Sequence, residues 1–206
     1  MIALPYLLRH ENICRLEGGK ILIGDRRVFP FEKRFEVCSS VAQVAQALRS
    51  MVTQGGGPLE VALQTMVFVT NQVQRGDLPG GFSTLADAAD QLIAARPTNT
   101  TMQRTLQSLL AQVRMFASDP DELSQAVGQQ VQSILDDYDR LYHQMGRMGS
   151  TLLDQDSVVL TTCFAEHTFL LSLAYAQESG KKIRVLANET RSYLQGSRLA
   201  APGLEE

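Results

Sequence analysis

The chain has 206 residues, a formal net charge of −3 and a hydrophobic fraction of 44%. These values indicate a globular protein with one large domain or two small ones, and they argue against nucleic-acid-binding proteins, which carry basic blocks. No apolar run reaches the roughly 18 residues that a membrane span needs, so we expect no membrane partner. Three widely spaced cysteines and three isolated histidines indicate reduced thiols, a cytoplasmic location and no metal site.

Residues 1–38 carry β-strand signals. Extended runs at 20–24 and 35–38 follow the turn Gly18-Gly19, which predicts an N-terminal β-hairpin region or meander. The first residues have no basic segment ahead of their short apolar run and no small-residue cleavage site. We therefore expect mature sequence here rather than a signal peptide.

Residues 39–149 form a predicted helical domain. Ser39 or Ser40 is expected to cap the first helix, and Pro58 suits the first position of the second. The last helix is the longest, and we expect its Met145 and Met148 to be core or helix-packing residues. Apolar residues recur at helical spacing in five segments, at 41–52, 58–75, 83–95, 101–116 and 120–147.

Residues 150–206 change to the pattern of an α/β fold. A strand at 157–162, a helix at 168–179 and a strand at 182–186 have the spacing of a βαβ unit with parallel strands. The predicted fold class is therefore α/β, a helical N-terminal domain with a small β-hairpin followed by a truncated, Rossmann-like parallel sheet. Because two parallel strands are marginal alone, we expect either that the chain is a fragment or that something else completes the sheet.

Two polar segments are candidate ligand sites. The segment that follows the second strand contains Asn188, Glu189 and Gln195, and ligands of open α/β sheets bind at the carboxyl ends of the strands. The glycine-rich turn 54–58 precedes a helix whose N-terminus can hold a phosphate. The alternative for that turn is a plain interhelical connection, with the carboxylate of Glu60 satisfying the helix N-terminus itself.

Four runs of the sequence together resemble a known family. They are DRRVFPFEKRFEVCSSVAQVAQALRSMVTQGGGPLEVA, ARPTNTT, VVLTTCFAE and NETRSYLQGSRL. In this order, over roughly residues 20–200, they are similar to the first part of the methylthioribose-1-phosphate isomerases. The same superfamily contains ribose-1,5-bisphosphate isomerases and the alpha, beta and delta regulatory subunits of translation initiation factor 2B.

The resemblance implies roles for particular residues. Cys163 stands at the family's active-site cysteine, Gln195 at its substrate glutamine, and Arg96 at an arginine that contacts the substrate. The segment Gln54, Gly55 and Gly56 stands where the family binds phosphate or sugar, although Gln54 replaces an arginine there. The family's catalytic aspartate has no counterpart in these 206 residues, and the family uses no metal or nucleotide cofactor.

Each implied role has a structural alternative. Arg96 is also typical of a surface arginine at a helix end, and Cys163 is also typical of a buried apolar cysteine. The neighbours of Cys163 favour the second interpretation, since Thr162, Phe164 and Glu166 replace the family's histidine, asparagine and glycine.

Two functions follow from the resemblance. The first is an aldose–ketose isomerase of the methionine-salvage type, acting on a phosphorylated pentose but inactive as this 206-residue chain. The alternative is a non-catalytic regulatory or assembly subunit, similar to those of initiation factor 2B, that binds a sugar phosphate or a nucleotide. Either function implies a homodimer or another oligomer.

Overall fold

The computed structural model describes residues 2–206, which divide into two compact units. Unit 2 consists of Ile13–Arg27 and Arg34–Leu135. Unit 1 consists of the N-terminal segment up to Asn12 together with Val28–Lys33 and Asp136–Glu206. None of the helices in this described part of the chain is long and apolar enough to cross a membrane.

Unit 2 contains a three-stranded antiparallel sheet and most of the helices. The strands are β1 (Cys14–Glu17), β2 (Lys20–Gly24) and β3 (Phe35–Cys38), in the order β1-β2-β3. This confirms the predicted N-terminal β-meander and adds β1 to the two expected strands. The helices are α2 (Val41–Arg49), α3 (Gly57–Gln74), α4 (Phe82–Ala95), α5 (Thr100–Val113), the 3-10 turn η2 (Arg114–Phe116) and the first half of α6 (Pro120–Ser150).

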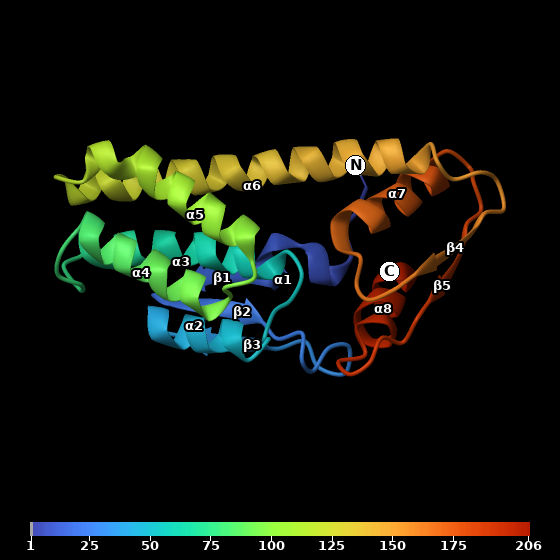
Figure 1. Ribbon diagram of the computed structural model, residues 1–206, viewed down its shortest axis with the longest axis horizontal. Helices are drawn as coiled ribbons and strands as arrows, with labels where there is room; N and C mark the ends of the chain where they lie inside the picture. Colours follow the sequence, from blue (N-terminus) through green and yellow to red (C-terminus); the bar gives the residue numbers. More distant parts are fainter. Residues whose placement is uncertain (1) are drawn as a thin grey trace. The chain divides into compact units, whose positions relative to one another are not determined.

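Helix α3 is the central element of unit 2 (Figure 1). It contacts β1, β2, α2, α4 and α5, which explains why its apolar residues are not confined to one stripe. Val61, Leu63, Met66 and Val69 on it are all fully buried. Its β-branched sequence, unusual for a helix, is therefore tolerated because packing on every side outweighs helix propensity.

Side-chain caps set the starts of several helices. The Ser40 hydroxyl accepts the N–H of Gln43 at 3.3 Å, which selects Ser40 over Ser39 as the cap of α2. Asn99 accepts the N–H of Met102 at 3.0 Å at the start of α5. These bonds satisfy N–H groups that a helix leaves without intrahelical partners.

A buried carboxylate joins the two ends of the β2–β3 connection. The Asp25 side chain is fully buried and accepts bonds from Nε and Nη2 of Arg27, at 2.8 and 2.9 Å, and from Nε of Arg34 at 3.2 Å. Burial acts to raise the pKa of Asp25, but the hydrogen bonds and charges of the two arginines outweigh it and lower that pKa below its usual 3.8.

We predict that Asp25→Asn lowers the free energy of unfolding by about 2–4 kcal/mol at pH 7, because it removes the charge that two guanidinium groups face. A lowered folded-state pKa contributes stability above the unfolded-state value and loses it as pH falls through the folded-state value. We therefore expect urea unfolding between pH 7 and pH 2 to give a difference in the free energy of unfolding between wild type and variant that is constant above about pH 5. Below that pH the difference should become smaller. A gap that widens in acid would contradict this assignment.

Unit 1 contains a parallel two-stranded sheet built as a βαβ unit. Strands β4 (Val158–Thr161) and β5 (Arg184–Ala187) pair in parallel, with Val158 opposite Arg184 and Leu160 opposite Leu186. Helix α7 (Glu166–Glu178) connects them, which confirms the predicted strand–helix–strand order. The unit also contains η1 (Tyr6–Leu8), α1 (His10–Ile13, which ends in unit 2), the π-helical turn η3 (Gly196–Ala200) and α8 (Ala201–Glu205).

One face of the sheet in unit 1 is uncovered. Val158, Leu160 and Leu186 alternate onto the same face, and each is more than half exposed. Val159 and Val185 point to the opposite face and are partly buried. The two strands therefore have one apolar surface that the described residues do not cover.

The C-terminal half of α6 packs against α7 through two glycines (Figure 1). A Cβ atom at Gly146 would lie 2.6 Å from Cβ of Leu171, and one at Gly149 would lie 2.1 Å from Oγ of Ser172. The helices approach closely because these positions carry no side chain. Met145 and Met148 are 42% and 71% exposed, so the prediction that they belong to the core is wrong, whereas helix packing, the other role expected for them, stays a prediction.

We predict that Gly146→Ala lowers the free energy of unfolding of unit 1 by about 1–3 kcal/mol, because α7 must move to admit a methyl group. Gly128 lies in the same helix, and a Cβ there would meet nothing within 4 Å. Gly128→Ala is therefore the matched control and should stabilise by about 1 kcal/mol through helix propensity. Thermal unfolding followed by circular dichroism separates the two, and equal shifts of both variants would refute the close contact.

Candidate functional site

The carboxyl ends of β4 and β5 bring Cys163 and the segment 188–190 together in unit 1. The N–H of Cys163 donates to Oγ1 of Thr190 at 2.8 Å, and the hydroxyl of Thr190 donates to the carbonyl of Asn188 at 3.1 Å. The Asn188 amide in turn donates to Oγ1 of Thr162 at 3.0 Å. Because both strands end at the same edge of the sheet, the loops that follow them form one connected network.

Gly196 holds the Gln195 backbone against the same loop. The N–H of Gly196 donates to the carbonyl of Glu189 at 3.2 Å, and a Cβ atom on Gly196 would lie 1.5 Å from the carbonyl oxygen of Asn188. No side chain fits at this position, which explains on steric grounds why the run NETRSYLQGSRL has a glycine at 196. The predicted residues Cys163 and Gln195 therefore lie on segments that contact one loop.

Arg198 has a structural role in this unit. Its Nε and Nη2 donate to the carbonyl of Phe29 at 3.1 and 2.9 Å. The Phe29 ring stacks on Tyr6, with centroids 5.8 Å apart and an interplanar angle of 4°. The guanidinium thus ties the end of the chain to the segment Val28–Lys33 of the same unit.

The three thiols differ in their surroundings. Burial, the charge of Glu60 and the neighbouring thiol of Cys38 raise the pKa of Cys14, and burial and the charge of Glu36 raise the pKa of Cys38 to about 11. Both side chains lie in the core of unit 2. Cys163 is only partly buried and adopts a left-handed backbone conformation with φ of 67°. Of the three cysteines, Cys163 is the one that solvent reaches.

The glycine-rich turn lies in unit 2, directly before α3. Gly55 has a φ of 63°, which favours glycine. The carbonyl of Gln54 accepts the N–H of Gly57 at 3.2 Å and Nη1 of Arg26 at 2.6 Å. The Arg26 N–H donates to the carbonyl of Val52 at 2.8 Å, so this arginine binds the backbone on both sides of Thr53.

Arg26 and Thr53 are site residues that the sequence analysis missed. Arg26 is only 3% exposed, and Thr53 is fully buried. The Thr53 hydroxyl has no hydrogen-bond partner among residues 2–206, and a Cβ at Gly57 would lie 2.1 Å from it. A run of Asp25-Arg26-Arg27 reads as a surface turn, and only the fold shows that its middle residue is buried.

Arg96 binds the end of α2. Its Nη1 donates to the carbonyl of Leu48 at 3.3 Å and lies 2.7 Å from Sδ of Met51. A cation at a helix C-terminus is favourable, so this contact agrees with the structural alternative. No carboxylate in the described part of the chain forms an ion pair with Arg96, which leaves its other N–H groups able to meet an anion.

The predicted site residues therefore form two sets. Gln54, Gly55, Gly56 and Arg96 belong to unit 2, where Arg96 contacts the residues just before the turn. Cys163 and Gln195 belong to unit 1. Among residues 2–206, no three carboxylate, thiol or imidazole groups lie close enough to hold a metal ion.

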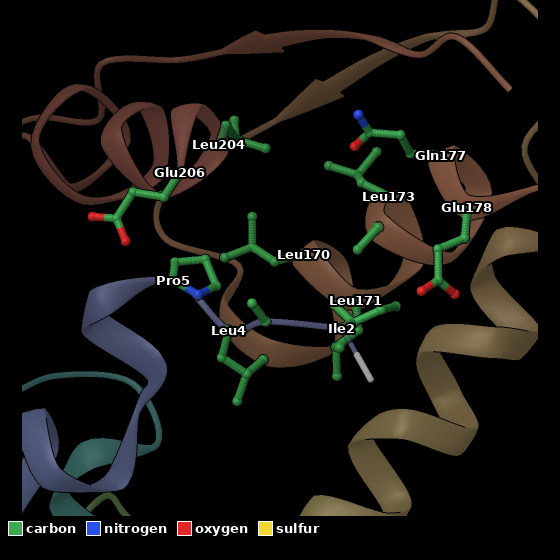
Figure 2. Close-up of a pocket in the computed structure, with 13 residues that line it drawn as sticks. Ile2, Leu4, Pro5, Leu170, Leu171, Leu173, Gln177, Glu178, Leu204 and Glu206 are labelled. Carbon is green, nitrogen blue, oxygen red and sulfur yellow. The ribbon is translucent and has the colours of Figure 1, made fainter. Parts of the chain in front are cut away.

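A separate cavity of about 360 Å³ lies in unit 1 (Figure 2). It is lined by aliphatic residues of the N-terminal segment and α7, such as Leu4, Leu170 and Leu173, with Leu204 of α8 on the far side. The carboxylates of Glu178 and Glu206 also line it. An apolar cavity with acidic groups disfavours a phosphate, and neither Cys163 nor Gln195 lines it.

We predict that one of the three thiols of the folded protein reacts readily with a disulfide reagent at pH 8. Only the thiolate reacts, whereas Cys14 and Cys38 are buried and their raised pKa values keep both thiols protonated at pH 8. Cys163→Ser should remove the fast phase, whereas Cys38→Ser should leave it unchanged. A fast phase that survives Cys163→Ser would show that another cysteine is accessible.

Comparisons with known proteins agree on one family. The model of the initiation factor 2 subunit family matches residues 59–206. The methylthioribose-1-phosphate isomerase of Syntrophotalea carbinolica is 32% identical over 192 residues, which cover 89% of this chain and 56% of that protein. The isomerase of Albidiferax ferrireducens is 32% identical over 203 residues, covering 91% and 55%. The chain thus spans about half the length of the curated relatives it matches.

Solved structures share the fold. The delta subunit of translation initiation factor eIF-2B from A. fulgidus superposes with a TM-score of 0.76 at 23% identity, covering 98% of this chain and 59% of that one. The 5-methylthioribose 1-phosphate isomerase from Pyrococcus horikoshii OT3 gives 0.79 at 20% identity, covering 94% and 57%. A chain of the tetrameric eIF2B-beta2-delta2 complex from C. thermophilum gives 0.55 at 17% identity, covering 81% and 58%.

Proposed function

The chain belongs to the initiation factor 2 subunit family, and from this we propose that it binds a phosphorylated pentose as a relative of the methylthioribose-1-phosphate isomerases. The observation that supports this most is the network at the carboxyl edge of β4 and β5. It joins Cys163, a partly exposed cysteine, to the loop against which Gln195 is packed. Ligands of parallel sheets bind at this edge.

The proposed division of roles follows the two sets of residues. The turn Gln54–Gly56 and Arg96 contribute N–H groups and positive charge for the phosphate. We assign Cys163 and Gln195 to the sugar, whose isomerisation opens the ring and moves a proton or hydride between C1 and C2. A thiol at that place stabilises transient charge, and an acid–base group is needed to move the proton.

We propose that the 206-residue polypeptide alone binds but does not turn over methylthioribose 1-phosphate. The resemblance assigns the acid–base role to an aspartate that these residues do not contain. Gln54 also gives the phosphate a neutral amide in place of a charged group that could bind two oxygens.

A second candidate function is a non-catalytic subunit that binds a sugar phosphate or a nucleotide, as in the eIF2B branch. The specific observation that favours it is the substitution around the cysteine by Thr162, Phe164 and Glu166. One structural neighbour is a chain of the tetrameric eIF2B-beta2-delta2 complex, and we propose that this chain also forms a homodimer or another oligomer.

We predict that methylthioribose 1-phosphate raises the Tm of the 206-residue protein, whereas methylthioribose and inorganic phosphate do not. A ligand that binds only the folded state stabilises by about 2.7 kcal/mol at one hundred times its Kd. Gln54→Arg should tighten binding by about tenfold, because a charge-assisted bond adds on the order of 1.4 kcal/mol. Gln107→Arg adds the same charge to an exposed position of α5 and should change nothing.

Three outcomes decide between the candidates. A shift by nucleotides such as AMP, with none by the sugar phosphate, supports the non-catalytic subunit. Isomerase product above that of Cys163→Ala would contradict the proposed inactivity but keep the binding site. No shift with any phosphorylated compound would sink the binding proposal.

A further inference from the structure

A polar cavity of about 520 Å³ lies beside the apolar cavity of unit 1. Its walls on α6 and α7 consist of Arg140, His143, Gln144, Arg147 and Tyr175. Ile2 and Glu178 line both cavities, so the two adjoin along these residues. We call them the apolar compartment and the polar compartment. A ligand that enters both needs an apolar part and a charged part.

The apolar compartment suits one aliphatic or aromatic side chain. Its volume of about 360 Å³ is at the lower end of ligand pockets, and Leu170 and Leu173 of α7 line its wall. Glu206 lies across this compartment from Glu178 (Figure 2). The Glu206 carboxylate already accepts the backbone N–H of Tyr6, so its charge is engaged within the chain.

The polar compartment contains two opposite charges that do not pair. Arg147 and Glu178 both line it, yet within residues 2–206 neither forms an ion pair with the other or with any other side chain. Their charged groups are therefore too far apart for direct contact. A ligand that carries both charges itself fits between them, because each end then gains a charge-assisted hydrogen bond.

Contacts within the chain hold the other polar groups of this compartment. Nη2 of Arg140 donates to the Asp137 carboxylate at 2.6 Å, so this guanidinium is already paired. Nδ1 of His143 lies 2.8 Å from the hydroxyl of Tyr175 and fixes the position of that ring. The Arg147 guanidinium lies over the Tyr175 ring, 5.0 Å from its centroid. This cation–π contact orients Arg147, and no carboxylate of residues 2–206 occupies its N–H groups.

A free α-amino acid with a large apolar side chain has the three parts that the compartments match. Its carboxylate can accept a forked pair of bonds from Arg147, and its ammonium group can donate to Glu178. Because Glu178 also borders the apolar compartment, an ammonium group bound there places the side chain of the ligand at the aliphatic wall. Fatty acids lack the ammonium group, and alkylamines lack the carboxylate.

We propose that the two compartments form a binding site for a free hydrophobic α-amino acid. This inference goes beyond the proposed function, because no residue of the two compartments belongs to the sets assigned to the phosphate and the sugar. The ligand contacts α6 and α7 at once, so its binding stabilises the packing of these two helices.

The first test compares ligands by isothermal titration calorimetry on the 206-residue protein. We expect saturable binding of one L-leucine per chain with a Kd below about 1 mM. Glycine keeps both charges but has no side chain, whereas 4-methylpentanoate lacks the ammonium group and 3-methylbutylamine lacks the carboxylate. Each of these three compounds should bind at least about tenfold more weakly than L-leucine.

The second test changes the two charges. Arg147 and Glu178 are both exposed, so their substitution leaves the core intact. Arg147→Gln and Glu178→Gln should each weaken L-leucine binding at least about tenfold. Arg114→Gln is the matched control, because it removes an exposed arginine from η2 of unit 2, and it should leave binding unchanged. Circular dichroism checks that each variant is folded.

Three results would overturn the proposal. The first is no binding of L-leucine at about 10 mM. The second is equal binding of L-leucine and 3-methylbutylamine, which would show that no carboxylate is recognised. The third is unchanged L-leucine binding by folded Arg147→Gln. Both charge variants should keep the Tm shift caused by methylthioribose 1-phosphate, so failure of the amino-acid site and failure of the proposed function give different results.

Discussion

The close approach of α7 to α6 is the contact on which unit 1 depends. It exists because Gly146 and Gly149 remove two side chains from the facing surface, so that Leu171 and Ser172 pack directly on the α6 backbone. Helix α7 in turn fixes the crossover between β4 and β5, and both strands then end at one edge. Cys163 lies beside the 188–190 loop because β4 and β5 pair in parallel and end at the same edge of the sheet.

Helix α6 buries only part of its apolar surface, since Leu141, Met145 and Met148 remain exposed. Helix α6 is 31 residues long, and in unit 1 Gly146 and Gly149 lie on the side that contacts α7. Apolar residues recur every seven positions from Val127 to Met148, although the elements that surround the two halves of the helix differ.

The sequence predicted regular elements well and buried polar groups poorly. Helical periodicity located α3 and α6 because their apolar residues are many and regularly spaced, and the two strands of unit 1 were bounded by clear turn residues. Met145 and Met148 follow the same periodicity but are exposed, because a pattern shows which residues share a face and not whether anything covers it. The burial of Arg26 and Thr53 was not predictable, since it depends on contacts between β2, α2 and α3 that local sequence does not contain. The matched runs named Cys163 and Gln195, and the link between their segments through Thr190 emerged only with the fold.

The uncovered face of the parallel sheet has a consequence for biosynthesis. Strands β4 and β5 pair only with each other among the described residues, so each keeps one edge of open backbone groups beside the apolar side chains of Val158, Leu160 and Leu186. Open edges of this kind recruit strands from other molecules, and nascent chains meet one another at high local concentration. Expression of these 206 residues should therefore yield inclusion bodies at 37 °C more readily than at low temperature. Soluble yield in the cell then depends on how soon chaperones or a covering polypeptide reach that surface.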